Sequence, residues 1–104
     1  MTEESLTDEL ALRALGWRKA PGRYLKAGRS WISDSRFQPL KNVEDAFRLL
    51  DAVADAYSLI SAPGPVYTVH LTAEGRTGSA TGKSKARTIC FAVARLLNLA
   101  GYRE

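Results

Sequence analysis

The stretch that decides the fold reads VYTVHL at residues 66–71, GRTGSATGKS at 75–84, and a regular helical pattern at 85–100. The first segment predicts a strand with apolar residues on both sides, so we expect a central strand that is at least partly covered on each face. In the last segment apolar residues recur every three or four positions, which predicts a helix that Gly101 ends. A strand that leads through a polar, glycine-containing loop into a helix can bind an anion, because the helix N-terminus presents free N–H groups.

Two further helices are predicted upstream. Residues 2–15 carry acidic side chains in their first turn, where the helix dipole favours negative charge, and Gly16 supplies the stop. The second helix begins after Asn42, which can cap its N-terminus. Its apolar residues predict a single buried stripe. The stripe consists of Val43, Ala46, Phe47, Leu50, Val53, Ala54 and Tyr57.

Short strands complete the pattern. Segments 24–26 and 30–32 predict one pair, and the strand at 66–71 continues through a turn into a weaker strand at 76–80. The predicted order is αββαββα, in which helices outnumber what one face of a small four-stranded sheet holds. We therefore expect a mixed α/β (α+β) domain spanning residues 1–104. In this three-layer α-β-α sandwich, a small, mostly antiparallel sheet lies between helices.

Composition excludes several classes of protein. The chain is 45% apolar and 25% charged, as soluble globular domains are. No apolar run approaches the roughly 20 residues that span a bilayer, and the acidic N-terminus lacks the order of a signal peptide. We expect a cytoplasmic protein without a membrane partner. Because Cys90 is the only cysteine, neither an internal disulfide nor a multi-cysteine metal cluster can form.

Charge is unevenly distributed along this basic chain, which has a net charge of +4 and a pI near 9.5. Residues 13–41 contain eight basic side chains and one acidic side chain, Asp34. Among the charged residues of 44–55, by contrast, all but Arg48 are acidic. A basic region and an acidic helix face are therefore expected. The basic region is either a surface for nucleic acid or phosphate, or a set of solubilising charges.

The segment 78–84 resembles the end of a phosphate-binding P-loop, but its spacing is wrong. A P-loop has four residues between its glycines, and Thr77 stands where the first glycine would be. Nucleotide hydrolysis is therefore not expected. Two interpretations stay open: a phosphate cradle, or an N-cap by Ser84 with exposed lysines around it. The cradle would consist of Thr81, Gly82, Lys83, Ser84 and Arg87.

No catalytic set emerges from the reactive residues. His70 is the only histidine, and a lone histidine on a strand is usually structural. Cys90 lies on the apolar face of the last helix, where a thiol is usually part of the core. Asp51 and Asp55 are opposite the predicted buried stripe and face solvent. The sequence predicts a non-enzymatic protein without metal or cofactor.

Large aromatic residues alternate with basic residues between 17 and 32, at Trp17, Tyr24 and Trp31. Such interleaving is typical of surfaces on which bases stack. Aromatic residues on half-buried strands also pack against neighbouring helices, and both interpretations are kept.

Several of these features together resemble a known family. The segment Leu15-Gly16-Trp17 after a first helix, aromatic strands ending near Trp31, FQPL at 37–40 before NVEDA at 42–46, and ARTICFA at 86–92 are similar to the phage ABA-sandwich domain family of small phage proteins. The resemblance covers nearly the whole chain and implies the α-β-α fold. It departs at Lys85, where the family commonly has proline, and in the few apolar residues of the fourth strand.

Small phage proteins of this type are also similar to anti-Thoeris and anti-CBASS sponges, which sequester nucleotide signals of bacterial immunity. This resemblance implies a homo-oligomer that acts in the infected bacterial cytoplasm and binds a cyclic ADP-ribose isomer or a cyclic oligonucleotide without cleaving it. It implies phosphate contacts and base stacking. The phosphate candidates are Arg18, Arg23, Lys83 and Arg87, and the stacking candidates are Trp31, Tyr24 and Phe37.

A different function also fits the basic segment 13–41. The chain would then be a phage accessory protein that binds nucleic acid or a host protein, with no small-molecule ligand.

Overall fold

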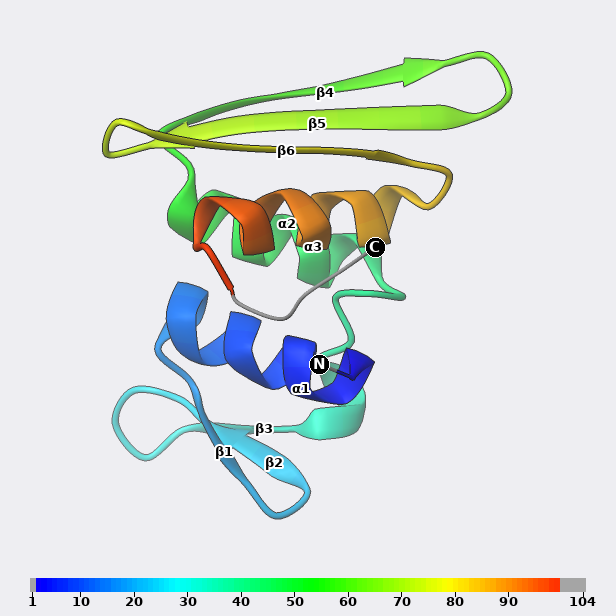
Figure 1. Cartoon of the computed structure of the whole chain (residues 1–104). Helices are drawn as coiled ribbons and strands as arrows, with labels where there is room; N and C mark the ends of the chain where they lie inside the picture. Colours follow the sequence, from blue (N-terminus) through cyan, green and yellow to red (C-terminus); the bar gives the residue numbers. More distant parts are fainter. Residues whose placement is uncertain (1, 100–104) are drawn as a thin grey trace.

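The computed structural model describes residues 2–99, which form three α-helices and six strands (Figure 1). Two short helical turns join them, a π-helical turn at Ala11–Leu15 and a 3-10 turn at Asp34–Arg36. The helices are α1 (Glu3–Leu10), α2 (Val43–Val53) and α3 (Lys85–Leu96), and the strands are β1 (Arg18–Ala20), β2 (Arg23–Leu25), β3 (Trp31–Ser33), β4 (Ala56–Ala62), β5 (Val66–Ala73) and β6 (Arg76–Gly82).

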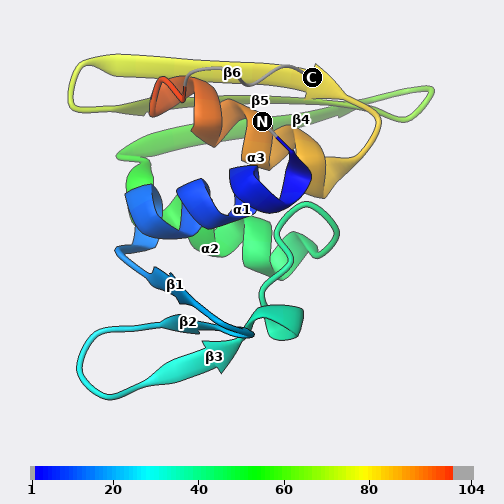
Figure 2. The ribbon, with the colours of Figure 1, turned by 60° about the horizontal axis from the view of Figure 1, so that its bottom comes forward.

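The strands form two separate antiparallel sheets, β1-β2-β3 and β4-β5-β6. All three helices lie between the two sheets (Figures 1 and 2). The mixed α+β class is confirmed, but the expected four-stranded sheet between helices is wrong. The helices bury their apolar stripes chiefly on one another and on the second sheet, so the order of layers is sheet, helices, sheet.

The largest correction concerns residues 54–62. The predicted apolar stripe carried the second helix to Tyr57, but α2 ends at Val53 and Ala54 is extended, with φ −80° and ψ 133°. Residues Ala56–Ala62 instead form β4, which pairs along its whole length with β5. Tyr57 and Ile60 are residues that favour a strand, and pairing with β5 satisfies backbone groups of the segment.

The start of α2 follows the prediction more closely. The Asn42 side chain accepts a hydrogen bond from the Asp45 N–H at 3.2 Å. Asp45 is buried and accepts from the Gln38 N–H at 3.0 Å, which fixes the turn before the helix. The buried side of α2 is shifted from the predicted stripe, because Leu49 is fully buried whereas Val43 is 36% exposed.

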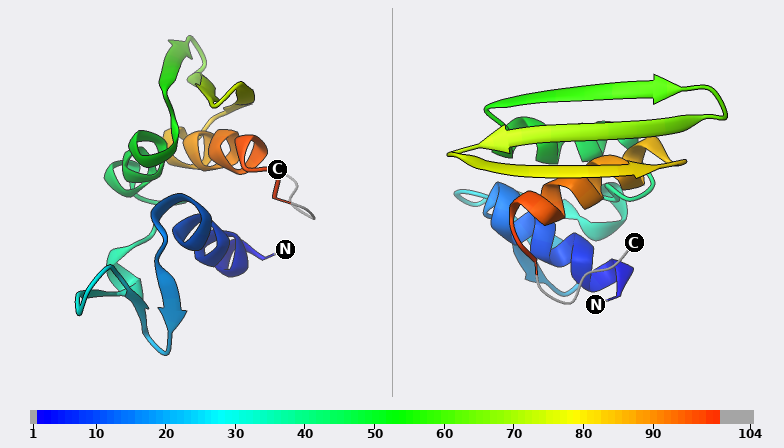
Figure 3. Two further views of the ribbon diagram at one scale, coloured as in Figure 1. Left: turned by 90° about the vertical axis from the view of Figure 1, so that its left-hand side faces the viewer. Right: turned by 45° about the horizontal axis from the view of Figure 1, so that its top comes forward.

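The central position of β5 is confirmed, but cover on both faces is not. Val69 and Leu71 are buried against α3, whereas His70 between them is exposed. The outer face of this sheet lies open in Figure 3. Helices cover one face only, so the alternation within β5 separates a core side from a solvent side.

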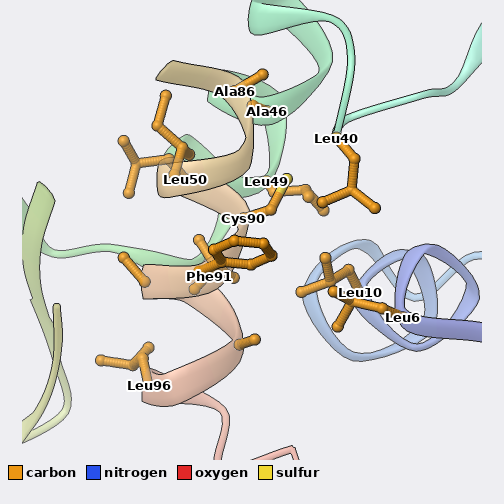
Figure 4. Close-up of a cluster of buried hydrophobic side chains, with 14 of the residues drawn as sticks. Leu6, Leu10, Leu40, Ala46, Leu49, Leu50, Ala86, Cys90, Phe91 and Leu96 are labelled. Carbon is orange, nitrogen blue, oxygen red and sulfur yellow. The ribbon is translucent and has the colours of Figure 1, made fainter. Parts of the chain in front are cut away.

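The core joins all three helices. Leu6 and Leu10 of α1 face Phe91 of α3, and Leu49 of α2 lies beside Cys90 (Figure 4). The predicted positions of α3 from Ala86 to Leu96 are buried, but burial goes round the helix, because every residue from 88 to 94 is buried. The helix was predicted to continue to Ala100 and to stop at Gly101, which lie outside the described residues, but α3 ends at Leu96, and Asn98 then adopts the left-handed conformation at φ 55°.

The first helix is formed as expected, with two additions. Thr2 and Ser5 form a reciprocal capping box at its start. Its last turn, Ala11–Leu15, is π-helical, and Gly16 ends it in the left-handed conformation at φ 72°. The chain then turns into β1, a strand that the sequence did not predict.

Candidate functional site

The outer face of the first sheet presents an exposed tryptophan among arginines. The register of the sheet aligns Arg18, Leu25 and Trp31 across the three strands, with Arg23 in the next outward row. Trp31 is 56% exposed, and the Arg23 guanidinium lies 4.8 Å from the centre of its ring. We call this surface the Arg–Trp face; it consists of Arg18, Arg23, Leu25 and Trp31.

The inner side of the same sheet belongs to the core. Tyr24 is 2% exposed and Phe37 is 1% exposed, and their rings meet edge to face at 5.6 Å. The Tyr24 hydroxyl donates to Asp8 Oδ1 at 2.6 Å. Burial is the main cause that raises the pKa of Tyr24 above its usual range, and the hydrogen bond to Asp8 raises it further. Tyr24 and Phe37 therefore present almost no ring surface to a base, unlike Trp31.

The predicted phosphate cradle is divided between a strand and a helix. Thr81 and Gly82 belong to β6, where the Thr81 hydroxyl lies 3.2 Å from that of Thr68. Ser84 is the N-cap of α3 and accepts from the Arg87 N–H at 3.3 Å. Lys83 is exposed between them.

Arg87 already has partners within the chain. Its guanidinium pairs with the Glu3 carboxylate of α1 and lies 5.2 Å from the centre of the Phe91 ring. The hydrogen bond and charge of Arg87 hold the pKa of Glu3 below its usual value. The ion pair connects the first and last helices of the described chain.

The two groups of predicted ligand residues do not meet within one chain. Arg18, Arg23 and Trp31 lie on the first sheet, and the segment 81–87 lies at the second sheet and α3, on the other side of the helical layer (Figure 1). A single site built from all of them would need a second copy of the chain.

A pocket of about 370 Å³ opens between α1, the first sheet and the segment after β3. Three acidic residues, Glu3, Glu4 and Asp34, line it together with two lysines, Lys19 and Lys41. Lys19 lies 3.1 Å from Asp34 and 3.8 Å from Asp8, so its charge is already paired. Because the acidic residues outnumber the lysines in the lining, the pocket suits a phosphorylated ligand poorly. No local sequence pattern predicted it, because its walls come from distant segments.

The remaining reactive residues, His70 and Cys90, lie apart from one another. His70 lies exposed in the second sheet, opposite Ser58 and Ser79. Cys90 is fully buried, and burial raises the pKa of its thiol to about 12, so the thiol is protonated at neutral pH. Within residues 2–99, no three His, Cys, Asp or Glu side chains are grouped to hold a metal ion. Over the same residues, every helix is too short or too polar to cross a membrane.

Sequence reasoning missed the exposure of Leu25, which belongs to the Arg–Trp face and is 43% exposed. The alternation of Arg23, Tyr24 and Leu25 in one strand would have placed Leu25 on the same side as Arg23, opposite Tyr24.

Comparison with known proteins yields a structural match only. No protein-family model matches the chain, and no curated protein matches it in sequence. The fold is similar to that of a phage protein from Bacillus cereus ATCC 14579 whose crystal structure is known. The TM-score is 0.74 at 15% sequence identity, over 95% of this chain and 90% of that one. The chain thus shares its fold, over nearly its whole length, with a phage protein.

Proposed function

We propose that this protein is a non-enzymatic binding protein that holds single-stranded nucleic acid on the Arg–Trp face. The observation that carries the proposal is the exposed Trp31 ring with Arg23 beside it on an open sheet. A base can stack on the ring while the arginines contact phosphates, and stacking of this kind contributes about 1–3 kcal/mol per base.

The charge around the face supports a polyanionic ligand. Within residues 2–99, Arg18, Arg23 and Arg29 have no carboxylate within ion-pair distance, whereas Arg13, Lys19 and Arg87 do. Arg29 lies in the exposed loop that joins β2 to β3. An open, basic sheet surface suits an extended strand better than it suits a small molecule, which proteins usually enclose in a concave site.

The sequestration of a phosphorylated nucleotide signal is the second candidate function. The exposed Lys83 beside the capped N-terminus of α3 favours it, since this end of the helix carries a positive charge and a positive dipole. In this version the protein is phage-encoded and counters bacterial defence from the cytoplasm. The phage origin of the structural neighbour makes a phage role of either kind a reasonable proposal.

Fluorescence anisotropy with labelled single strands of about 12 nucleotides tests the first function. We expect Trp31→Ala to weaken binding by about 10-fold, and Trp31→Phe to restore most of the affinity, because the loss is one of stacking. Arg23→Gln should also weaken binding and lower the dependence of log Kd on log salt by about 0.7, because one phosphate contact is lost.

Arg76→Gln is the matched control, since it removes the same charge from an exposed position of the second sheet. Arg76→Gln should reduce the affinity for single strands less than Arg23→Gln does. Equal affinity of Trp31→Ala and wild type would contradict the proposal. Thermal stabilisation by cyclic dinucleotides or ADP-ribose isomers, without binding of single strands, would favour the second candidate instead.

A further inference from the structure

The strand β4 is exposed on both faces of its sheet. Six of its seven residues are exposed, and only Leu59 is partly buried. The helix α3 packs against β5 and β6, while β4 reaches away from the helices at the edge of the sheet (Figure 3, left). Tyr57 is 46% exposed and Ile60 is 60% exposed, so two large apolar side chains of this strand face solvent.

The two edges of this sheet differ in protection. At the β6 edge the Arg95 guanidinium donates to the Ser79 carbonyl at 2.7 Å, and the charged residues Arg76 and Lys83 stand at either end of the strand. The β4 edge has no charged residue and no proline between Ala56 and Ala62, and Pro63 follows directly after the strand. Asp55, just before it, is turned toward the β5–β6 turn, where it accepts from the Glu74 N–H at 3.0 Å.

An unprotected edge of this length is a template for pairing with another strand. Monomeric proteins usually block such edges with charges, proline or a covering element. In this chain the Arg95 side chain covers part of the β6 edge in this way. Within Ala56–Ala62 neither a charge nor a proline blocks the edge, so β4 can accept a partner strand along its length.

The sequence of β4, AYSLISA, is complementary to itself when two copies run antiparallel around Leu59. Ala56 then faces Ala62 of the second copy, Tyr57 faces Ser61, and Ser58 faces Ile60. Each of these three pairs contains at least one small residue, so the side chains fit without a clash. None of the pairs buries a charge. A two-fold axis midway between the two Leu59 residues gives the isologous contact that closed dimers use.

An apolar surface continues from β4 onto α2. The Phe47 ring lies 6.4 Å from that of Tyr57, and Val43, one turn earlier, is 36% exposed. A second copy seated at this edge would cover these side chains as well as satisfy the open backbone groups of the strand.

We propose that two copies of the chain associate by antiparallel pairing of β4 with β4, centred on Leu59. The two β4-β5-β6 sheets then become one continuous sheet of six strands. The Arg–Trp face is separated from this edge by the helical layer, so each copy keeps its own (Figure 1).

Sedimentation equilibrium of the whole chain tests the proposal. We expect a dimer of twice the 11.4 kDa chain mass. The double variant Ser58→Lys/Ile60→Lys should be monomeric, because directly opposite residues of the two copies would then both be lysines. Thr77→Lys/Ser79→Lys adds the same charge to exposed positions of the other edge strand and should stay dimeric.

Cysteine cross-linking checks the register without relying on the folding of the lysine variants. Directly opposite Cβ atoms of paired strands lie about 4.5–5.5 Å apart, so oxidation can link cysteines placed there with a small adjustment. Leu59→Cys should form covalent dimers by itself. Ile60→Cys should form them efficiently only when mixed with Ser58→Cys. Cys90 is fully buried and should not react.

Three results would overturn the proposal. The first is a wild-type monomer at concentrations up to about 1 mM, the weak limit of specific association. The second is a dimer that the Ser58→Lys/Ile60→Lys variant leaves intact while remaining folded by circular dichroism. The third is failure of Leu59→Cys to cross-link in a dimeric protein, which would place the contact elsewhere.

Discussion

At the scale of single residues, Gly78 fixes how closely the second sheet approaches α3. A Cβ atom at this position would lie 2.4 Å from the Ala92 carbonyl oxygen and 2.7 Å from the Leu96 nitrogen. Both are backbone atoms of the helix and cannot move aside as a flexible side chain can. The close approach, and not an unusual backbone conformation, requires glycine here.

We expect Gly78→Ala to lower the free energy of unfolding by about 1–3 kcal/mol, because the strand must separate from the helix to admit the methyl group. Urea denaturation followed by circular dichroism measures the change. Thr77→Ala is the matched control, since Thr77 is the exposed neighbour of Gly78 on the same strand. A Gly78→Ala protein as stable as the control would show that the strand and helix can separate at no cost.

At the scale of elements, the N-terminus of α3 illustrates how one sequence pattern supports two interpretations. Ser84 accepts a hydrogen bond from the Arg87 N–H, and its carbonyl accepts one from the Thr88 hydroxyl at 2.6 Å. These contacts satisfy groups at the first turn without any ligand. The N-cap interpretation is thus sufficient to explain Ser84. Lys83 beside it is exposed and is not explained by the cap.

Ser84→Ala should lower the free energy of unfolding by about 1 kcal/mol, the usual cost of removing an N-cap, while affinity for single strands stays unchanged. Thermal unfolding and the anisotropy assay measure the two effects on one preparation. Ser84→Asp should restore stability, because aspartate is an equally good cap. A loss of nucleotide affinity in Ser84→Ala that exceeds its loss of stability would instead favour the phosphate cradle.

At the scale of the whole molecule, the helices are shared between the two sheets. The hydrogen bond from Tyr24 to Asp8 joins the first sheet to α1, and the ion pair of Arg87 with Glu3 joins α1 to α3. The β5 residues Val69 and Leu71 are fully buried in the same cluster as Leu10. One continuous core therefore stabilises both sheets.

We expect the two sheets to unfold in one transition, because neither has a core of its own. Both tryptophans, Trp17 and Trp31, lie in or beside the first sheet, so their fluorescence reports on that half of the molecule. Amide resonances of β5 report on the other half. The urea midpoints should coincide, and Gly78→Ala, a change in the second sheet, should shift both equally. Separate midpoints would indicate two independent folding units.

The predictions that were confirmed rest on neighbouring residues. Asn42 and Ser84 cap helices because their side chains reach N–H groups three residues ahead, and Gly16 stops a helix because it adopts φ 72°. The turn at Glu74 and Gly75 likewise follows from backbone preferences. Such contacts span only a few residues, so the sequence contains all that decides them.

The candidate site was predictable only in part. Arg18, Arg23 and Trp31 lie together on one face, whereas Tyr24 and Phe37, which have the same chemistry, lie in the core. Which side of a strand faces the core depends on the helix packed against it. The failed prediction for Tyr57 has a similar cause, since its spacing fits both a helix and a strand.

The sequence alone determined the mixed α+β class, the helix starts and the central strand β5, because local hydrogen bonds and periodic burial decide them. Only the tertiary structure decided that the strands form two sheets with the helices between them, that β4 is an open edge, and that Trp31 faces solvent. Those outcomes depend on which distant segments pair. The balance between burying apolar surface and satisfying backbone groups sets that pairing for the chain as a whole.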